Sequence, residues 1–236
     1  MPDNILKIKH LFAFASLIIL IILSAGCVSL KGRSSGIQPI PLEAGKIVVL
    51  GFKPAIALGG KPDVIRSPIS GTVFMAEPVS TGAADKMTTL LFDRLLEYKR
   101  FELIGPGRAR ALLSRLVSED QGIGNTEIIK KIGQAFSADA VMTGQIYRWQ
   151  EREGKDYSVN RPASVAFDLY LIKPEDGAVL WKGKFDKTQL SLSENLLDLR
   201  TFIKGKGKWM TVEGLAETGL DELLQKSLRV QAKSED

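Results

Sequence analysis

The sequence predicts one α/β domain over residues 46–230, built on a mixed β-sheet with packed helices and antiparallel C-terminal strands. Between residues 46 and 140, short β-branched runs alternate with segments that have helical apolar periodicity. Two runs with alternating apolar side chains then flank a turn that ends at Gly177, which is typical of a β-hairpin. The resulting order is strand, helix, strand, two helices, three strands and a final helix, with no internal repeat.

The first strand is predicted at residues 46–50 (KIVVL), a β-branched run that Gly51 ends. The segment 52–82 after it is rich in proline and glycine and long for a loop, so we expect it to be functional or to hold a hairpin. Within it, SPISG (residues 67–71) has the spacing of a metal knuckle, but hydroxyls stand where thiolates would. We interpret it as a tight turn before a strand over residues 72–75.

Three helices are predicted next, with a short strand at residues 101–104 between the first and the second. Thr81 is expected to cap the first helix, and the third helix is expected to begin at Asn125 or Thr126 and to end at Phe136. Their apolar positions recur at helical spacing and are expected to face inward. These positions are Ala84, Met87, Leu91, Leu95, Tyr98, Ala109, Leu112, Leu113, Leu116, Ile128, Ile132 and Ala135.

The last three strands are expected to form an antiparallel run. A long strand is predicted at residues 140–150, followed by a charged hairpin tip at residues 151–160. In residues 165–172, apolar side chains alternate with a more polar set, which predicts one apolar face, containing Phe167, and one mixed face. KPEDG (residues 173–177) is a turn, and the return strand after it places three large apolar side chains on one face: Val179, Trp181 and Phe185.

The C-terminal part of the chain is less regular. Residues 190–208 are ambiguous between helix and loop. A last helix is predicted over residues 212–228, although Gly214 and Gly219 weaken this assignment. Its inward positions are expected to be Ala216, Leu220, Leu223 and Leu224.

Residues 1–26 have the layout of a lipoprotein signal peptide. Lys7 and Lys9 form a basic start, and the apolar run that follows, residues 11–23, is shorter than the roughly 18–20 residues that span a bilayer. Small residues up to Gly26 then precede Cys27, the only cysteine of the chain. This arrangement resembles the bacterial lipobox. It implies cleavage between Gly26 and Cys27 and acylation of Cys27 by groups such as palmitate, the alternative being a plain secretory signal with an incidental cysteine.

Residues 27–45 are expected to tether the domain to the membrane. They carry glycine, serine and proline with little apolar periodicity, and a flexible chain of this length has a reach of about 20–25 Å. More than one acyl chain is needed for a stable anchor. In Gram-negative lipoproteins, an aspartate after the cysteine commonly signals retention in the inner membrane. Val28 stands at this position, so for a Gram-negative host the lipobox resemblance implies an outer-membrane anchor with the domain facing the periplasm.

The composition excludes several kinds of site from the mature chain. His10, the only histidine, lies in the signal peptide, and acylation would occupy the only thiol. Catalysis by Ser-His-Asp or Cys-His groups and zinc sites built on imidazole or thiolate would then be absent. We therefore expect no catalytic residue, metal or cofactor. The mature chain would carry 30 basic and 26 acidic residues, a mild excess that gives no reason to expect nucleic acid.

Several motifs follow one another along residues 46–186. An apolar strand leads to a helix that ends in LLEYKR, a strand that reads FELI and, further on, the segment AFSADAVMTGQI (residues 135–146). In this last segment a helix passes through Ser137-Ala138-Asp139 into a strand that contains Thr143-Gly144. The arrangement resembles the group of envelope lipoproteins that includes the curli channel CsgG, the penicillin-binding-protein activator LpoB and the amino-terminal domain of TolB. The resemblance implies a TolB-like α/β fold and a non-catalytic protein that binds partners or assembles.

Three functions from different classes remain open. The favoured one is a membrane-anchored lipoprotein that binds an envelope protein or cell-wall partner in envelope assembly, secretion or cell-wall synthesis. The second is a homo-oligomeric secretion pore similar to the curli channel, for which residues 140–150 and 165–172 are long enough but have the pattern of a soluble sheet. The third is a carboxylate-dependent enzyme. The acids near strand ends that could serve it are Asp139, Asp168, Glu175 and Asp176.

A basic cluster near the C-terminus is a candidate surface-binding site. Its members are Arg200, Lys204, Lys206, Lys208 and Trp209. Cationic side chains beside an aromatic suit an anionic surface, where each is worth about 1 kcal/mol. The alternative is a loop whose lysines are only solvated, with Trp209 packed into the domain. On the second helix, we interpret Arg108, Arg110 and Arg115 as a solvated face and not as a phosphate site.

Overall fold

The computed structural model describes residues 45–155, 158–189 and 209–232. All of them lie in the compact unit Ile37–Asp236, whereas the unit Met1–Gly36 falls outside the described residues. The predicted signal peptide, its cleavage site and Cys27 therefore cannot be compared with the structure. Among the described residues, no helix combines the length and apolar character that a membrane span requires.

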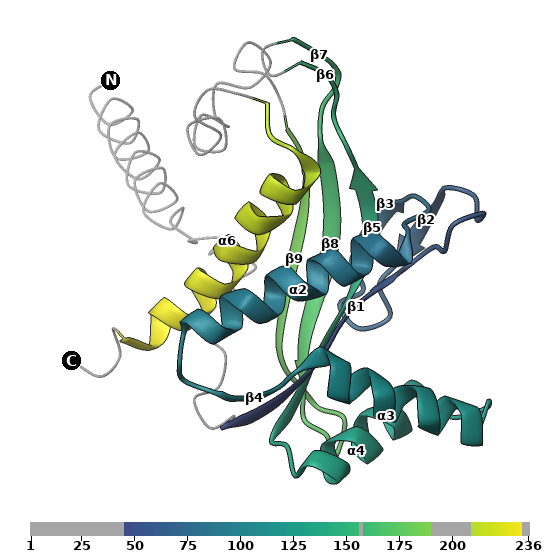
Figure 1. The fold of residues 1–236 in the computed structure, drawn as a ribbon, viewed down its shortest axis with the longest axis vertical. Helices are drawn as coiled ribbons and strands as arrows, with labels where there is room; N and C mark the ends of the chain where they lie inside the picture. Colours follow the sequence, from purple (N-terminus) through teal and green to yellow (C-terminus); the bar gives the residue numbers. More distant parts are fainter. Residues whose placement is uncertain (1–44, 156–157, 190–208, 233–236) are drawn as a thin grey trace, which may run out of the picture. The chain divides into compact units, whose positions relative to one another are not determined.

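Five strands form one mixed sheet in the order β4-β1-β5-β8-β9 (Figure 1). β1 runs parallel to β4 and β5, whereas β5, β8 and β9 are successively antiparallel. The predicted class, including the antiparallel C-terminal strands, is confirmed. The strands are β1 (Lys46–Pro54), β4 (Glu102–Ile104), β5 (Ala140–Gln150), β8 (Ser164–Ile172) and β9 (Val179–Thr188).

The prediction that Gly51 ends the first strand is wrong, because β1 continues through a bulge to Pro54. The register with β5 shifts between Val49 and Gly51, and Gly51 has a φ of 78°. A Cβ at this position would lie 2.1 Å from Cγ2 of Thr88, whose Oγ1 accepts a hydrogen bond from the Phe52 N–H at 2.9 Å. The left-handed backbone and the close approach of Thr88 therefore both require glycine here.

Two helices, α2 (Thr81–Glu97) and α6 (Val212–Ala232), cover one face of the sheet (Figure 1). Ser80 caps α2, one residue before the predicted Thr81, because its Oγ accepts a hydrogen bond from the Ala83 N–H at 3.1 Å. The predicted inward positions of α2 and α6 are buried, with the exception of the half-buried Tyr98. The periodicity of these two segments thus identified the faces that pack on the sheet, whereas Ala135 of the third predicted helix is exposed and not inward as expected.

The core under α2 and α6 is built around Phe167 of β8, which has no exposed surface. Its ring meets the Phe52 ring edge-on at 5.6 Å and the tilted Phe185 ring at 5.4 Å. The predicted apolar face of this strand is confirmed. Gly219 of α6 lies against the same cluster, since a Cβ there would be 2.7 Å from the Phe185 ring. Close packing thus explains a glycine that weakens the helix prediction.

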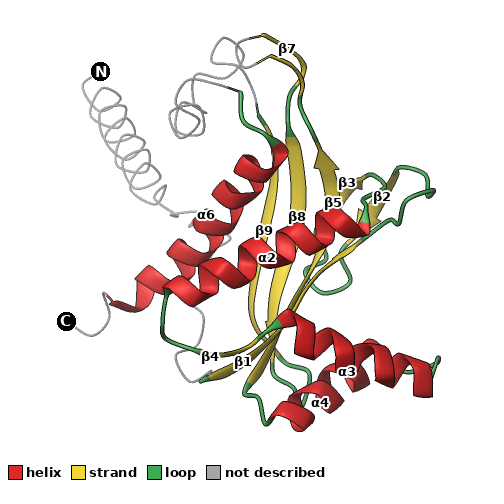
Figure 2. Ribbon diagram, in the orientation of Figure 1, coloured by secondary structure: helices red, strands yellow, loops and turns green. Residues whose placement is uncertain are grey.

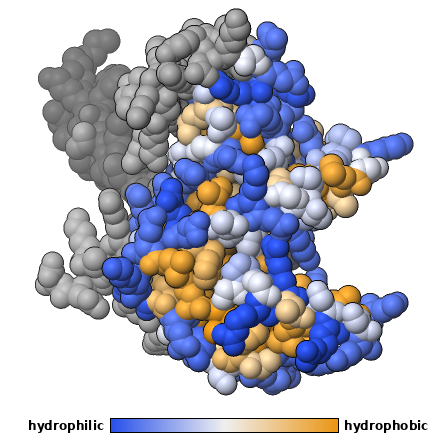
Figure 3. Space-filling model, viewed as in Figure 1, coloured by the Kyte–Doolittle hydropathy of each residue, from blue (hydrophilic) through white to orange (hydrophobic). Residues whose placement is uncertain are grey.

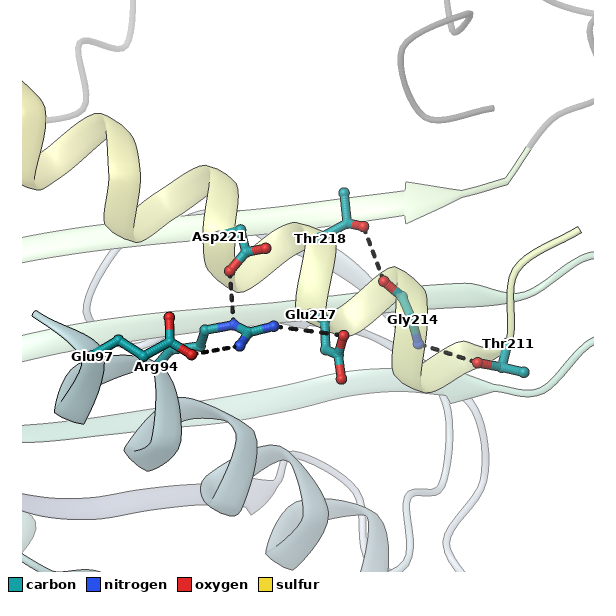
Figure 4. Close-up of polar contacts among 7 residues, drawn as sticks. All are labelled: Arg94, Glu97, Thr211, Gly214, Glu217, Thr218 and Asp221. Atoms are coloured by element: carbon teal, nitrogen blue, oxygen red, sulfur yellow. Dashed lines mark hydrogen bonds and ion pairs between the residues drawn. The ribbon is translucent and has the colours of Figure 1, made fainter. Parts of the chain in front are cut away.

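An ion-pair network joins α2 to α6 at the edge of this core (Figure 4). The Arg94 guanidinium donates to Asp221 at 2.9 Å and lies 3.7 Å from Glu217, both on α6. It also donates to Glu97 on its own helix at 2.9 Å. One guanidinium therefore links the two helices that share the core.

The opposite face of the sheet is covered in two places (Figure 2). The helices α3 (Pro106–Glu119) and α4 (Asn125–Phe136) cover one end, and a hairpin of β2 (Asp63–Arg66) and β3 (Val73–Ala76) packs at the other. The Phe74 ring of β3 stacks on the Tyr147 ring at 4.0 Å. The long segment before α2 therefore holds the expected hairpin, and SPISG forms its turn.

Three details of the strand predictions need correction. The mixed face of β8 is buried throughout, because the β2–β3 hairpin packs on it. The charged tip holds a second small hairpin, formed by β6 (Glu153–Lys155) and β7 (Ser158–Arg161). Val179 is 42% exposed, since the register of β8 and β9 shifts beside it and it lies at the sheet edge.

Candidate functional site

A groove of about 570 Å³ lies between the two structures that cover the second face of the sheet. α3 and α4 form one wall, the turn of the β2–β3 hairpin forms the other, and β1, β5 and β8 form the floor. The surface is indented between the hairpin and the α3–α4 pair on the right of Figure 3. The volume is within the range of about 300–1,000 Å³ that ligand pockets occupy.

Two of the strands beneath the groove carry glycine at neighbouring positions, and the Cβ that each glycine lacks would point toward the α2 side of the sheet. Gly51 and Thr143 pair across β1 and β5, as do Phe52 and Gly144. A Cβ on Gly144 would lie 2.4 Å from the Asp168 carbonyl oxygen and 2.5 Å from the Phe52 ring. The neighbouring strands approach Gly144 this closely because it has no side chain.

Apolar side chains form most of the two walls. Leu113 of α3 and Ile128 and Ile129 of α4 line one wall, and Pro68 and Ile69 of the hairpin turn line the other. Several are partly exposed, and Ile69 is exposed. An apolar recess that remains open to solvent is typical of a binding surface.

The groove has a one-sided charge. Lys53 and Arg110 line it, and none of its lining residues is acidic. Arg110 pairs with Asp85 and donates to Thr88 Oγ1 at 3.1 Å, so its charge is already balanced. Lys53 is exposed and has no acidic partner within the described chain. Lys53 therefore supplies the free charge of the groove.

Uncharged polar side chains are distributed among the apolar ones. Ser114 lies on α3, and Asn125 and Thr126 lie at the start of α4. None of the three makes a side-chain hydrogen bond within the part of the chain that the structure describes. Thr143 and Gln145 add further hydroxyl and amide groups on the floor. A ligand in this groove would meet hydrogen-bonding groups along its length.

A buried polar cluster supports the floor. Asp168, with no exposed surface, accepts hydrogen bonds from the Tyr147 hydroxyl at 2.8 Å, from the Gln145 N–H at 3.2 Å and from the Tyr170 hydroxyl. The Tyr170 hydroxyl also bonds Ser67 Oγ at 2.6 Å. The cluster therefore ties the hairpin turn to β5 and β8 and holds the groove rigid.

The titration of this cluster is shifted by its burial. Burial raises the pKa of Asp168, and the hydrogen bonds from Tyr170 and Tyr147 offset only part of this effect. Burial, together with the hydrogen bond to Asp168, raises the pKa of Tyr170 to about 12, and burial also raises the pKa of Tyr147. Tyr147 has one hydroxyl proton but lies within reach of two acceptors, Asp168 Oδ2 and Gln145 Oε1 at 3.0 Å. The Tyr147 hydroxyl can therefore donate to only one of these two oxygens at a time.

Exposed apolar side chains gather on the hairpin beside the groove (Figure 3). Val64 and Met75 pair across β2 and β3 and are 55% and 65% exposed, and Val73 lies on the same outer face. An outward hairpin face would ordinarily be polar. The apolar surface of the groove wall thus continues onto the hairpin.

Most predicted site residues lie outside the described residues. This holds for Gly26, Cys27 and the basic side chains Arg200, Lys204, Lys206 and Lys208. Trp209 is described: it is half-buried, and its carbonyl accepts a hydrogen bond from Arg152 at 3.0 Å.

The four candidate acids have separate structural settings. Asp139 accepts a hydrogen bond from the Lys46 N–H at 2.7 Å, Glu175 pairs with Lys173 at 2.7 Å, and Asp176 accepts from the Ala178 N–H at 2.9 Å. Asp168 is not near a strand end as expected, but in the middle of β8. In the described chain, no three His, Cys, Asp or Glu side chains are grouped as metal ligands.

The sequence interpretation missed the groove. The sequence pattern places Arg110 on a solvated helix face, whereas in the structure Arg110 lines the groove. One signal was available: an aspartate in the middle of an otherwise apolar strand must find donors, and Tyr147 and Tyr170 are the nearby hydroxyls. The walls left no comparable signal, since their residues come from segments far apart in the chain.

Residues 83–186 match a family model described as "Peptidoglycan-synthase activator LpoB". The match covers less than half of the chain, and it confirms the resemblance to the LpoB group that the motifs indicated. The matched segment contains β4, α3, α4, β5 and β8 and most of α2 and β9, whereas the β2–β3 hairpin and α6 lie outside it. The family name describes an activator of a synthase, which is a partner-binding role in the cell envelope.

Solved structures also resemble this chain, at low identity. A PelC dodecamer from Paraburkholderia phytofirmans matches at 14% identity and a TM-score of 0.42, covering 81% of this chain and 92% of that one. The LpoB C-terminal domain from Escherichia coli matches at 16% identity and a TM-score of 0.36, covering 62% and 84%. Lipoprotein GNA1162 from Neisseria meningitidis matches at 16% identity and a TM-score of 0.37, covering 67% and 91%. Likenesses this weak carry no information about function. A comparison with curated proteins found no match.

Proposed function

We propose that this chain is a non-catalytic lipoprotein of the cell envelope that binds and activates a peptidoglycan synthase. The match of residues 83–186 to the activator family carries this proposal. That segment supplies α3 and α4, which form one wall of the groove, and the β5 and β8 parts of its floor.

The geometry of the groove supports binding to a protein partner. Its floor consists of paired strands held by a buried polar cluster, so the surface is ordered before a partner arrives. Apolar walls with interspersed hydrogen-bonding groups are the usual composition of a protein-binding surface. The apolar outer face of the hairpin extends this surface.

The proposal places the domain in the periplasm, anchored to the outer membrane through acylated Cys27. The lipobox-like sequence before Cys27 and the glycine- and serine-rich segment after it support this placement. An anchored activator would meet a synthase whose own domains reach into the periplasm, and the tether sets how far the domain can extend.

The test uses the lipidated chain and a purified bifunctional peptidoglycan synthase from the same organism, both in detergent micelles. We expect saturable binding and a faster rate of glycan-strand polymerisation at saturation. The matched control is the same chain after heat unfolding, which should have neither effect. A native chain that neither binds the synthase nor changes its rate at any concentration would refute the proposed function.

A further inference from the structure

We propose that the groove between α3–α4 and the β2–β3 hairpin binds an extended peptide segment of a protein partner, with an acidic side chain of that segment placed at Lys53. The inference rests on the proposed function in that it names the contact through which such a partner would be held. It is argued from the charge, the polarity and the shape of the groove.

The charge of the residues that line the groove favours an acidic ligand. The lining includes no aspartate or glutamate, and the Lys53 ammonium has no acidic partner within the described chain. Lys53 stands opposite Gln145 in the register of β1 and β5, so its charge projects beside an amide on the floor. A carboxylate placed there would meet a cation and a hydrogen-bonding amide without facing any like charge.

The distribution of polar groups in the groove favours a peptide ligand over an acyl chain. A fatty acid would place one polar end at Lys53 and would cover the rest of the groove with hydrocarbon. Ser114, Asn125 and Thr126 on the helical wall would then lose water without gaining a partner, which is costly. A peptide carries an amide at every residue and can bond these side chains along its length.

The shape of the groove fits an extended segment. The walls are apolar on both sides, with Leu113 and Ile129 opposite the hairpin turn at Ile69. Alternate side chains of an extended peptide point in opposite directions, so apolar residues could contact the walls while an acidic residue faces Lys53. The recognised chemistry is therefore apolar side chains flanking an acid.

In the experiment, peptides from a random library are first selected for binding to the full chain. Peptides that also bind a groove-blocked variant, Ser114→Trp, are then removed. Ser114 is exposed at the rim, so a tryptophan there fills the groove without disturbing the core. Arg115→Trp, at the exposed neighbouring position outside the groove, is the matched control. Circular dichroism and melting curves establish that both variants are folded.

The surviving peptides are then measured by fluorescence anisotropy against two charge variants. Lys53→Glu should weaken binding by about five- to tenfold, because an attraction becomes a repulsion, and added salt should reduce the difference. Lys61→Glu reverses an exposed charge on the same segment outside the groove and should change binding less than twofold, to within about 0.4 kcal/mol.

Each outcome has a defined meaning. Peptides that combine acidic and apolar residues, bind Arg115→Trp as they bind the unchanged chain, and lose affinity with Ser114→Trp and Lys53→Glu would support the inference. It is overturned if no peptide depends on the groove, if the survivors are basic, or if dodecanoate displaces them at comparable affinity. Peptide binding without any effect on the synthase would refute the proposed function and leave the groove assignment standing.

Discussion

Replacing Phe167 with alanine should remove the centre of the core that α2 and α6 share. The ring has no exposed surface and contacts the rings of Phe52 and Phe185 at 5.6 and 5.4 Å. Phe→Ala substitutions in cores cost about 3–5 kcal/mol. Each aromatic contact adds about 0.5–1.5 kcal/mol beyond buried area. Because β8 is an interior strand under two helices, the site cannot collapse easily, and we expect a loss of about 4–5 kcal/mol.

The loss is measured by urea unfolding of the purified protein, followed by circular dichroism. In a thermal melt of a chain of this size, the Phe167→Ala substitution should lower Tm by roughly 10–20 °C. The matched control is Val179→Ala on the neighbouring strand, where the side chain is 42% exposed and the expected change is within about 0.5 kcal/mol. A loss below about 1 kcal/mol for Phe167→Ala would show that this side chain does not lie in the core, and would refute the assigned face of β8.

Four further predictions concern other parts of the molecule. Gly219→Ala should destabilise the protein, because the new Cβ would lie 2.7 Å from the Phe185 ring. The opposing effect is that alanine is about 1 kcal/mol more favourable than glycine in a helix. A raised Tm for this variant would contradict the close packing of Gly219. The raised pKa of buried Asp168 means that the folded state holds the carboxyl proton more tightly than the unfolded state, so the free energy of unfolding falls as pH rises above about 4. Asp168→Asn should remove this dependence on pH. Parallel pH–stability curves for the two proteins would count against the raised pKa of Asp168. Arg94→Gln should cost about 1 kcal/mol in low salt and less in high salt, as measured by urea unfolding, and a loss that is independent of salt would argue against the ion pairs in Figure 4. Cys27→Ala should leave unprocessed, unacylated precursor in cells, and normal processing of this variant on a gel, with membrane attachment retained, would refute the lipobox interpretation.

The β2–β3 hairpin and α6 lie outside the segment that the activator family model matches. α6 completes the core, since Leu215, Leu220 and Leu224 cover β8 and β9, which would otherwise be open to solvent. The hairpin forms the second wall of the groove and carries an apolar outer face. A partner that uses this groove would therefore contact both the matched segment and an element outside it.

Local pattern was sufficient for most of the secondary structure. The bounds of β5 agree with the prediction because eleven consecutive residues have strand character and a helix ends just before them. The inward positions of α2 and α6 follow from apolar spacing, since a helix that packs on a sheet must present one apolar stripe. Such features depend on neighbours in the sequence, and the sequence contains them.

Predictions failed where a contact between distant segments decided the outcome. Gly51 has the appearance of a strand end in the sequence, but Thr88 of α2 supplies the hydrogen bond that allows β1 to continue past it. The polar face of β8 has the pattern of a solvent-facing surface, but the hairpin covers it. Asp168 is tolerated there because donors from β5 and β8 meet at its carboxyl group.

The sequence by itself determined the α/β class, the order of the helices and of the five strands of the main sheet, and the expectation of a lipoprotein of the LpoB-like group. Only the tertiary structure decided which segments line one groove: Lys53 of β1, the middle of α3 with Arg110, the start of α4 and the hairpin turn. Periodicity reports which face of an element is buried, but not which distant element covers it. A binding surface assembled from several segments depends on that second fact, and therefore appears only when the chain is folded.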